Sequence, residues 1–240
     1  MERFFVEPDA IQENTAIITG EDVAHITRVL RLKEGGEIRV CDGQGTEYTA
    51  RLTLLQKQEV QAALVEQVAI HTEPAHTVTL YQGLPKTGKM EVIIQKCVEL
   101  GVSAIVPMVT ARCVVKPDAD FEKKRVRYQR VAYEAAKQSG RGIIPAVRPL
   151  ITFAQLPYGA YDLVLHAYEE EDVRTLKQAL QSDKAQNIAI LIGPEGGFTK
   201  EEVALSTQNG AKTVTLGSRI LRTETAGMAM LAMTLYELEG

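Results

Sequence analysis

Residues 187–200, NIAILIGPEGGFTK, have the composition of a ligand-binding loop. The apolar run at their start ends at Gly193, as expected for a strand buried on both faces of a parallel sheet. Gly196 and Gly197 lack side chains, so a ligand could approach the backbone closely there. A glycine loop at the carboxyl end of a strand is typical of ligand binding in α/β sheets, although such a loop can also simply turn the chain.

A second glycine-containing segment, residues 83–90 with the sequence GLPKTGKM, nearly matches the phosphate-binding loop of nucleotide hydrolases. Met90 stands where a hydroxyl would hold Mg²⁺, and the nitrogen of Pro85 has no proton to donate to a phosphate. Nucleotide hydrolysis is therefore the weaker interpretation, and we expect Lys86 and Lys89 to be exposed cations near the start of a helix. No predicted strand is followed by the G-x-G-x-x-G pattern of dinucleotide-binding proteins.

Residues 216–226, LGSRILRTETA, would make a poor surface loop, because the adjacent large apolar side chains of Ile220 and Leu221 need burial. We expect this segment to be tucked inside the protein. The helix predicted after it is apolar nearly all round, which indicates either a buried helix or a subunit interface.

Charge is unevenly distributed along a chain whose net charge is −4. Residues 1–72 contain 7 Lys and Arg against 12 Asp and Glu, whereas residues 112–148 contain 10 against 4. The helix predicted within the second region places four cations on one side: Lys123, Arg127, Arg130 and Lys137. A solvated helix face would explain this pattern, but a local excess of cations also suits a polyanion.

Two regions differ in their pattern of secondary structure. Residues 1–72 indicate a small, mostly β unit with one helix between residues 21 and 32. From residue 73 to residue 240 strands alternate with helices, which predicts a second domain with a mainly parallel sheet. Its predicted strands span residues 77–81, 104–108, 162–166, 188–192 and 213–216. Its predicted helices span residues 89–100, 121–138, 172–180, 200–208 and 224–238, and a capping box of Thr199 and Glu202 introduces the fourth.

Composition narrows the class of protein. A hydrophobic content of 45% with 24% charged residues is ordinary for a globular chain. Three cysteines without metal-ligand spacing argue against a disulfide framework and against a metal site. The N-terminus has no basic segment followed by an apolar core, and no apolar run could span a membrane, so we expect a cytoplasmic protein without a membrane partner.

Four motifs together resemble a known family. PKTGKMEVIIQKCVELGV, EAAKQSGR, IGPEGGFTKEE and LGSRILRTETA occur in this order behind a small β domain that opens with RFF. The set is similar to the bacterial small-subunit (16S) ribosomal RNA uracil-N3 methyltransferases, which are trefoil-knotted proteins of the SPOUT class. The resemblance covers essentially the whole chain. It implies a PUA-like RNA-binding β-barrel in residues 1–72, a knotted α/β domain with helices on both faces in residues 73–240, S-adenosyl-L-methionine as cofactor, and a homodimer formed through the C-terminal helix region.

The same resemblance implies functional residues, position by position. Backbone groups of three loops would hold the cofactor, and Ile220 and Leu221 would pack on its adenine. The cofactor candidates are His166, Ala167, Gly193, Glu195, Gly196, Leu216, Gly217, Ile220 and Leu221. The candidates for contact with RNA are Arg3, His25, Arg31, Lys86, Lys96, Arg141 and Arg222. The loop that begins at His166, HAYEEE, matches the family only loosely.

The implied reaction is methylation of N3 of a specific uridine in small-subunit ribosomal RNA, either naked or in the assembled subunit. The N3 proton must leave, so Arg222 would stabilise the charge that develops on the base, and Glu224 or a water would take the proton. Because N3 lies on the pairing edge, the base must be unpaired or flipped out. A different class of function, a non-catalytic RNA-binding or ribosome assembly factor with the same fold, is the alternative.

Overall fold

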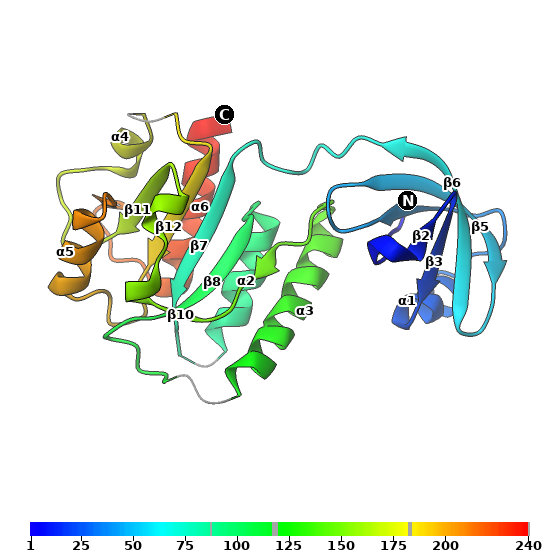
Figure 1. Ribbon diagram of the computed structural model, residues 1–240, viewed down its shortest axis with the longest axis horizontal. Helices are drawn as coiled ribbons and strands as arrows, with labels where there is room; N and C mark the ends of the chain where they lie inside the picture. Colours follow the sequence, from blue (N-terminus) through cyan, green and yellow to red (C-terminus); the bar gives the residue numbers. More distant parts are fainter. Residues whose placement is uncertain (87, 117–119, 182–183, 240) are drawn as a thin grey trace. The chain divides into compact units, whose positions relative to one another are not determined.

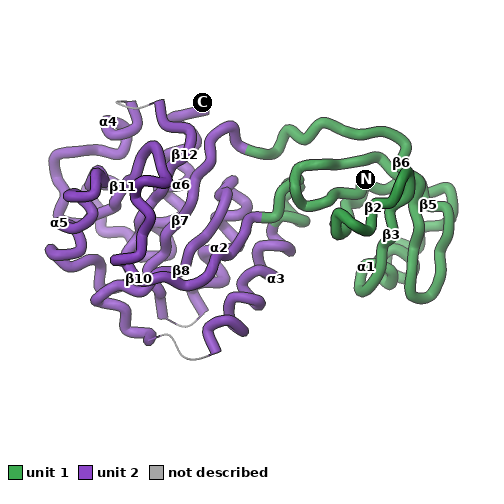
Figure 2. The backbone as a smooth tube through the Cα atoms, in the orientation of Figure 1, with its two compact units in different colours: residues 1–73, 136–144 green, residues 74–135, 145–240 purple. Residues whose placement is uncertain are grey.

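The computed structural model describes residues 1–86, 88–116, 120–181 and 184–239. The chain divides into two compact units (Figures 1 and 2). Unit 1 comprises residues 1–73 and 136–144, and unit 2 comprises residues 74–135 and 145–240. Within the described ranges, no helix combines the length and the apolar composition needed to cross a membrane.

Unit 1 is built on a curled six-stranded sheet with the order β1-β4-β5-β6-β3-β2. Its strands are β1 (Arg3–Phe5), β2 (Ile11–Gln12), β3 (Thr15–Thr19), β4 (Glu37–Cys41), β5 (Glu47–Leu55) and β6 (Glu59–Val68). β1 pairs with β4 in parallel, and the other neighbours pair antiparallel. Alternate side chains, among them Phe4, Ile18, Ile38 and Leu52, fill one buried apolar core. The predicted β unit is therefore present, with β2 as an additional short strand.

The helix expected between residues 21 and 32 is shorter and less regular than predicted. After a short 3-10 turn (η1, Pro8–Ala10), α1 (Glu21–Ala24) passes directly into a π-helical turn (η2, His25–Val29). The chain then reverses at Arg31, whose φ of 53° is uncommon for a residue with a Cβ. Apolar spacing predicted the helix but could not reveal this change of backbone geometry.

Unit 2 contains a parallel sheet with the order β10-β8-β7-β12-β11-β13, and β9 pairs with β8. Its strands are β7 (Thr77–Gly83), β8 (Ala104–Val109), β9 (Ala146–Val147), β10 (Ile151–Thr152), β11 (Leu163–Ala167), β12 (Asn187–Ile192) and β13 (Lys212–Val214). Every pairing is parallel, which confirms the predicted sheet. The two-residue strands β9 and β10 were not predicted, because they are too short to show a period.

Helices cover both faces of this sheet, as expected. They are α2 (Lys89–Glu99), α3 (Phe121–Ser139), α4 (Leu176–Gln181), α5 (Lys200–Gln208) and α6 (Thr223–Glu239), with 3-10 turns η3 (Phe153–Gln155) and η4 (Tyr158–Ala160). α6 packs on α2, on α4 and on the face that carries Leu80. On the opposite face, Tyr81, Leu191 and Phe198 share a buried cluster against which Val203 of α5 packs.

Local signals set where α5 and α4 begin. The predicted capping box is present at α5: the Thr199 hydroxyl accepts from the Glu202 N–H at 3.2 Å, and the Thr199 N–H donates to the Glu202 carboxylate at 2.9 Å. α4 begins four residues later than expected, at Leu176. The carboxylate of Glu171 accepts the N–H groups of Val173 and Arg174, each at 3.0 Å, so a turn precedes the helix.

The carboxyl ends of β7 and β12 meet so closely that Gly83 has no room for a side chain. A Cβ at Gly83 would lie 2.6 Å from both the nitrogen and the Cδ of Pro194. The first residue of α6 joins these ends, because the Thr223 hydroxyl donates to the Gly193 carbonyl at 2.5 Å and accepts from Nε2 of Gln82 at 2.9 Å. Three segments distant in sequence are thus held at one edge of the sheet.

We predict that Gly83→Ala destabilises the protein by about 1–3 kcal/mol. The backbones at Gly83 and at Pro194 cannot move apart without disturbing the sheet. The matched control is Gly159→Ala, because no atom lies within 4 Å of a Cβ built at Gly159. Urea unfolding of both variants measures the effect. Equal stability of the two variants would show that the contact between Gly83 and Pro194 does not constrain the fold.

Candidate functional site

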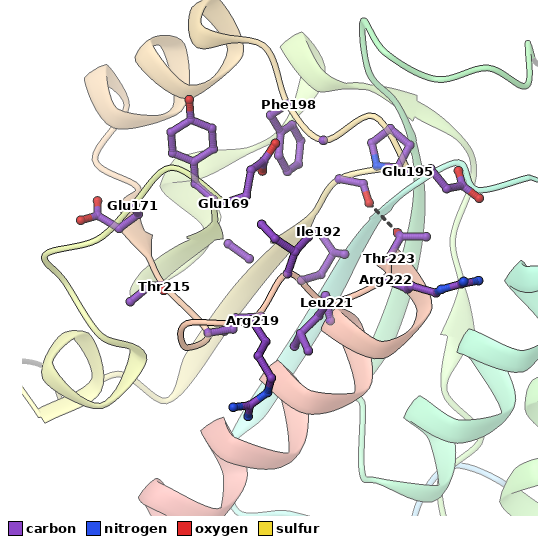
Figure 3. A pocket seen from close by; sticks show the side chains of 18 of the residues that line it. Glu169, Glu171, Ile192, Glu195, Phe198, Thr215, Arg219, Leu221, Arg222 and Thr223 are labelled. Carbon is purple, nitrogen blue, oxygen red and sulfur yellow. Dashed lines mark hydrogen bonds between the residues drawn. The ribbon is translucent and has the colours of Figure 1, made fainter.

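A cavity of about 850 Å³ opens at the carboxyl ends of the central strands of unit 2 (Figure 3). Its walls are the loop of residues 167–172 after β11, the loop of residues 193–198 after β12 and the segment 215–222 before α6. Ile192 and Leu221 contribute apolar surface, and charged side chains surround them. A cavity of this size with a mixed lining is typical of sites for small molecules.

Seven of the nine predicted cofactor residues line this cavity. They are Ala167, Gly193, Glu195, Leu216, Gly217, Ile220 and Leu221. The motifs therefore pointed to one connected space, although they come from three separate parts of the chain.

His166 lies behind the cavity wall rather than on it. Its side chain is fully buried, with Nδ1 2.7 Å from the Ser206 hydroxyl and the ring centroid 4.2 Å from that of Phe198. Burial lowers the pKa of His166 to about 3, so the ring is neutral at physiological pH. His166 supports Phe198, which does line the cavity.

The two adjacent glycines of the loop face different ways. A Cβ at Gly196 would lie 3.0 Å from the Cβ of Arg112, and the Gly196 carbonyl accepts from Nη1 of Arg112 at 3.0 Å. Gly196 therefore faces Arg112 and not the cavity. Gly197 lines the cavity and has a φ of +67°, and a Cβ there would collide with the carboxylate of Glu169. The positive φ favours glycine at this position, and the absence of a Cβ also leaves room for the Glu169 carboxylate in the place where it lies.

The expectation that Ile220 and Leu221 are both tucked inside is wrong for Ile220. The Ile220 side chain lines the rim of the cavity and is 81% exposed, whereas Leu221 is partly buried. Residues 217–220 run along the surface of the rim, so the segment does not enter the core there. Hydrophobicity predicted burial of this side chain, but it could not show that Ile220 stays exposed within the chain itself.

Lys89 forms an ion-pair network that the sequence did not predict. Its Nζ lies 3.0 Å from a carboxylate oxygen of Glu195 and 3.0 Å from one of Glu224. The backbone N–H of Lys86 also donates to Glu195, at 3.1 Å. The near-match to a phosphate-binding loop was the sequence feature that could have revealed this network. Its cation and its N–H group do bind an anion, but that anion is a carboxylate of the same chain. Thr87 of that motif lies outside the described residues.

The network keeps its three members charged. The hydrogen bond to Glu195 and then that to Glu224 raise the pKa of Lys89. Burial opposes ionisation of Glu195, yet hydrogen bonds from its own N–H, from the Lys86 N–H and from Lys89 leave its pKa lowered. The pKa of Glu224 is lowered by its own backbone N–H and, against some burial, by Lys89. Glu224 thus lies just behind the wall as a carboxylate.

Arg222 is placed differently from its neighbour Glu224. It is exposed and lines the cavity, and in the described part of the chain its guanidinium forms no hydrogen bond or ion pair (Figure 3). The same holds for the guanidinium of Arg219. The rim therefore offers cations that remain available to an anionic ligand.

The predicted RNA-contact residues separate into two groups. Lys86 is exposed at the cavity, Arg31 is exposed on unit 1, and His25 packs edge-on against Phe4 at 5.9 Å. Lys96 is partly exposed and pairs with Glu99 at 2.8 Å. These four residues keep at least part of their surface accessible.

Arg3 and Arg141 are instead held within unit 1. Arg3 pairs with Glu47 at 2.9 Å and donates to the Arg141 carbonyl at 3.0 Å. The Arg141 side chain is only 4% exposed and pairs with Glu73 at 2.5 Å. The expectation of an open basic surface at Arg141 is therefore corrected, because Glu73 neutralises the guanidinium away from solvent.

The basic stripe of α3 is also partly neutralised. Lys123 pairs with Asp120 at 2.9 Å, Arg127 pairs with Glu91 at 2.5 Å, and Lys137 pairs with Asp22 at 2.6 Å. Three of the four cations of this stripe therefore have a carboxylate partner, although only the pair of Lys137 and Asp22 is largely shielded from solvent.

Comparisons with known proteins agree with this geometry. The family model of the RNA methyltransferase domain matches residues 71–235, and that of the RNA methyltransferase PUA domain matches residues 18–65. Ribosomal RNA small subunit methyltransferase E of Bacillus subtilis is 38% identical over 250 aligned residues, with 100% of this chain and 98% of that protein covered. The protein of the same name from Synechocystis is 37% identical, with 96% of this chain and 76% of that protein covered.

A solved structure is also similar. It is the ribosomal RNA small subunit methyltransferase E of Neisseria gonorrhoeae bound to S-adenosyl methionine, with a TM-score of 0.84, 32% identity, and coverage of 98% of this chain and 97% of that chain. Fold, cavity and family matches together define an RNA methyltransferase with an N-terminal PUA domain. The chain belongs to the ribosomal RNA small subunit methyltransferase E family, which confirms the resemblance carried by the four motifs.

We predict that Lys89→Met lowers the melting temperature by a few degrees at neutral pH, because Glu195 and Glu224 would repel each other without the cation. Both carboxyls have pKa values below their ordinary 4.5, so their contribution to stability is present above pH 4.5 and is lost as the pH falls below it. The deficit of the variant should therefore be largest at pH 7 and shrink at pH 3.5.

Thermal unfolding of Lys89→Met at the two pH values measures this dependence. Lys200→Met is the control, since Lys200 is 79% exposed and lies 3.8 Å from Glu170, where an ion pair contributes little. A deficit of Lys89→Met that does not change with pH would contradict the proposed role of the two carboxylates.

Proposed function

We propose that this protein uses S-adenosyl-L-methionine to methylate N3 of a specific uridine in small-subunit ribosomal RNA. The observation that carries the proposal is the single cavity formed by the loops that the family motifs marked, with the free cation Arg222 at its rim. The names of the Bacillus subtilis and Neisseria gonorrhoeae proteins support the substrate class, and the S-adenosyl methionine bound to the latter supports the cofactor.

The cavity suits this cofactor in size and in chemistry. Ile192, Leu216 and Leu221 offer apolar surface for an adenine, and backbone groups at Gly193 and Gly217 offer polar contacts. S-adenosyl-L-methionine, when bound, supplies a methyl group on a sulfonium sulfur. The contribution of the protein is to hold the acceptor nitrogen in line with that group and to exclude water.

Loss of the N3 proton leaves negative charge on the neighbouring carbonyl oxygens of uracil. Arg222 is the cavity residue placed to stabilise that charge, because its guanidinium is not consumed by another side chain. Glu224, which Lys89 holds at 3.0 Å just behind the wall, accepts the proton through a water. Lys86 and Arg219, also at the cavity, attract the RNA backbone of an unpaired or flipped uridine.

The proposal includes a homodimer formed through the C-terminal helix region. On α6, Met233 is 40% exposed and Tyr236 is 79% exposed, and Ile220 at the cavity rim is 81% exposed. Large apolar side chains in contact with water favour cover by another surface.

The proposal also includes a trefoil knot, in which residues 216–221 pass through the loop near Gly193. The hydrogen bond from Thr223 to the Gly193 carbonyl brings the end of that segment beside the loop, as this path requires, while the side chains of residues 218–220 stay exposed. A boundary between the RNA-binding and the methyltransferase domains near residue 73 completes the proposed organisation.

Nucleoside mass spectrometry tests the proposed activity. The protein is incubated with S-adenosyl-L-methionine and either naked small-subunit ribosomal RNA or assembled small subunits, and 3-methyluridine is the expected product. Tight cofactor binding without transfer to any of these RNAs would instead favour a non-catalytic RNA-binding or assembly factor.

We predict that Arg222→Lys lowers the single-turnover methylation rate by about 100-fold at saturating RNA, because lysine keeps the charge but loses the planar, preorganised fork. Affinity for S-adenosyl-L-methionine, measured by calorimetry, should stay within about twofold of wild type. A variant that reacts at the wild-type rate would reduce Arg222 to a binding or structural residue and make Glu224 the next candidate.

We predict that Met233→Glu weakens dimerisation by at least about 100-fold, because an unpaired carboxylate would be buried in the interface. Sedimentation velocity at low concentration should then show a folded monomer. Met230→Glu is the comparison, since Met230 is fully buried within unit 2 and this variant should fail to fold. A folded Met233→Glu dimer with wild-type affinity would exclude this surface as the interface.

A further inference from the structure

The lining of the cavity carries both cations and carboxylates. The cations are Lys86, Arg219 and Arg222, to which the proposed reaction assigns roles. The loop of residues 168–172 contributes three carboxylates, which have none in it so far: Glu169, Glu171 and Asp172. The function of this acidic loop is therefore argued from its own contacts.

Two of the four carboxylates that line the cavity, Glu195 and Glu171, are already bound within the protein. Glu195 binds Lys89 at 3.0 Å and the Lys86 N–H at 3.1 Å. Glu171 accepts from the Thr213 hydroxyl at 2.5 Å, in addition to the two backbone N–H groups of the turn before α4. Their negative charges are therefore not available to a ligand.

Glu169 differs from these residues. Across the described ranges of the chain, its carboxylate forms no hydrogen bond or ion pair, and it lines the cavity. The side chain reaches from the loop after β11 to the glycine loop, where it lies directly against Gly197 and beside the ring of Phe198 (Figure 3). Gly197 allows this approach because a Cβ there would collide with the carboxylate.

An unpaired carboxylate in a partly enclosed cavity favours a cationic ligand over a neutral one. S-adenosyl-L-methionine carries a permanent positive charge on its sulfur. The product that remains after methyl transfer, S-adenosyl-L-homocysteine, has a neutral thioether there and is otherwise the same molecule. The two ligands therefore differ in the positive charge that the carboxylate of Glu169 would attract.

We propose that Glu169 makes the cavity discriminate between the two by charge, so that the sulfonium form binds more tightly and the spent cofactor leaves more readily. The inference rests on the proposed function. A single charge acting over several ångströms in a partly hydrated cavity changes affinity by about three- to tenfold, which sets the size of the expected preference.

Calorimetry with both ligands tests this preference in wild type, Glu169→Gln and Glu170→Gln. Glu169→Gln should weaken S-adenosyl-L-methionine by about three- to tenfold and leave S-adenosyl-L-homocysteine within about twofold. Glu170→Gln is the matched control: Glu170 is the next residue in the same loop, but it does not line the cavity, it lies 3.8 Å from Lys200, and glutamine can keep its hydrogen bond with Tyr168. It should leave both affinities unchanged.

The pattern of loss separates the possible roles of Glu169. Equal weakening of both ligands would show that Glu169 binds a group they share, such as the ribose hydroxyls or the ammonium, and would overturn the proposal. Unchanged affinities in a variant that melts at the wild-type temperature would also overturn it. Failure of the wild type to bind either ligand would reject the proposed function itself, and the inference with it.

Discussion

One buried hydroxyl joins the segments that form the cavity. Thr223 donates to the Gly193 carbonyl and accepts from Gln82, so the start of α6 is fixed to the ends of β7 and β12. Thr223 is 6% exposed and Gln82 is fully buried, so water does not replace either bond, and an unsatisfied partner would cost roughly 1–3 kcal/mol. The rim segment 215–222 is anchored at its end by this contact, and the position of Arg222 follows from it.

The ion pairs at the same edge of the sheet explain what the segment that resembles a phosphate-binding loop binds in place of a phosphate. Lys89 and the Lys86 N–H bind the carboxylate of Glu195, which belongs to the glycine loop, and Lys89 also holds Glu224 at the start of α6. The network thus adds the start of α2 to the segments that the Thr223 hydroxyl joins. It also consumes the charges of Glu195 and Glu224, so that the nearby guanidinium of Arg222 is left unpaired.

Features that depend on neighbours in sequence were predictable. Continuous apolar runs placed the five main strands of unit 2 to within about two residues, and the spacing of Thr199 and Glu202 placed the start of α5 correctly. Features that depend on distant partners were not. Arg141 looked like a free cation because Glu73, which neutralises it, lies 68 residues earlier in the chain. Ile220 was predicted to be buried because its side chain is hydrophobic, but hydrophobicity alone does not show whether the fold of the same chain covers it.

The run Glu169-Glu170-Glu171 shows why site residues are harder to predict than strands. Three identical side chains in a row have three different environments: Glu169 faces the cavity against Gly197, Glu170 is 60% exposed near Lys200, and Glu171 caps a turn and accepts from Thr213. Periodicity cannot distinguish them, because the loop has no repeating geometry. The three carboxylates differ in the part of the fold that each one contacts, and these contacts are set by the pairing of β11 with β12 and β13. A charge becomes available to a ligand only where the fold supplies no partner for it.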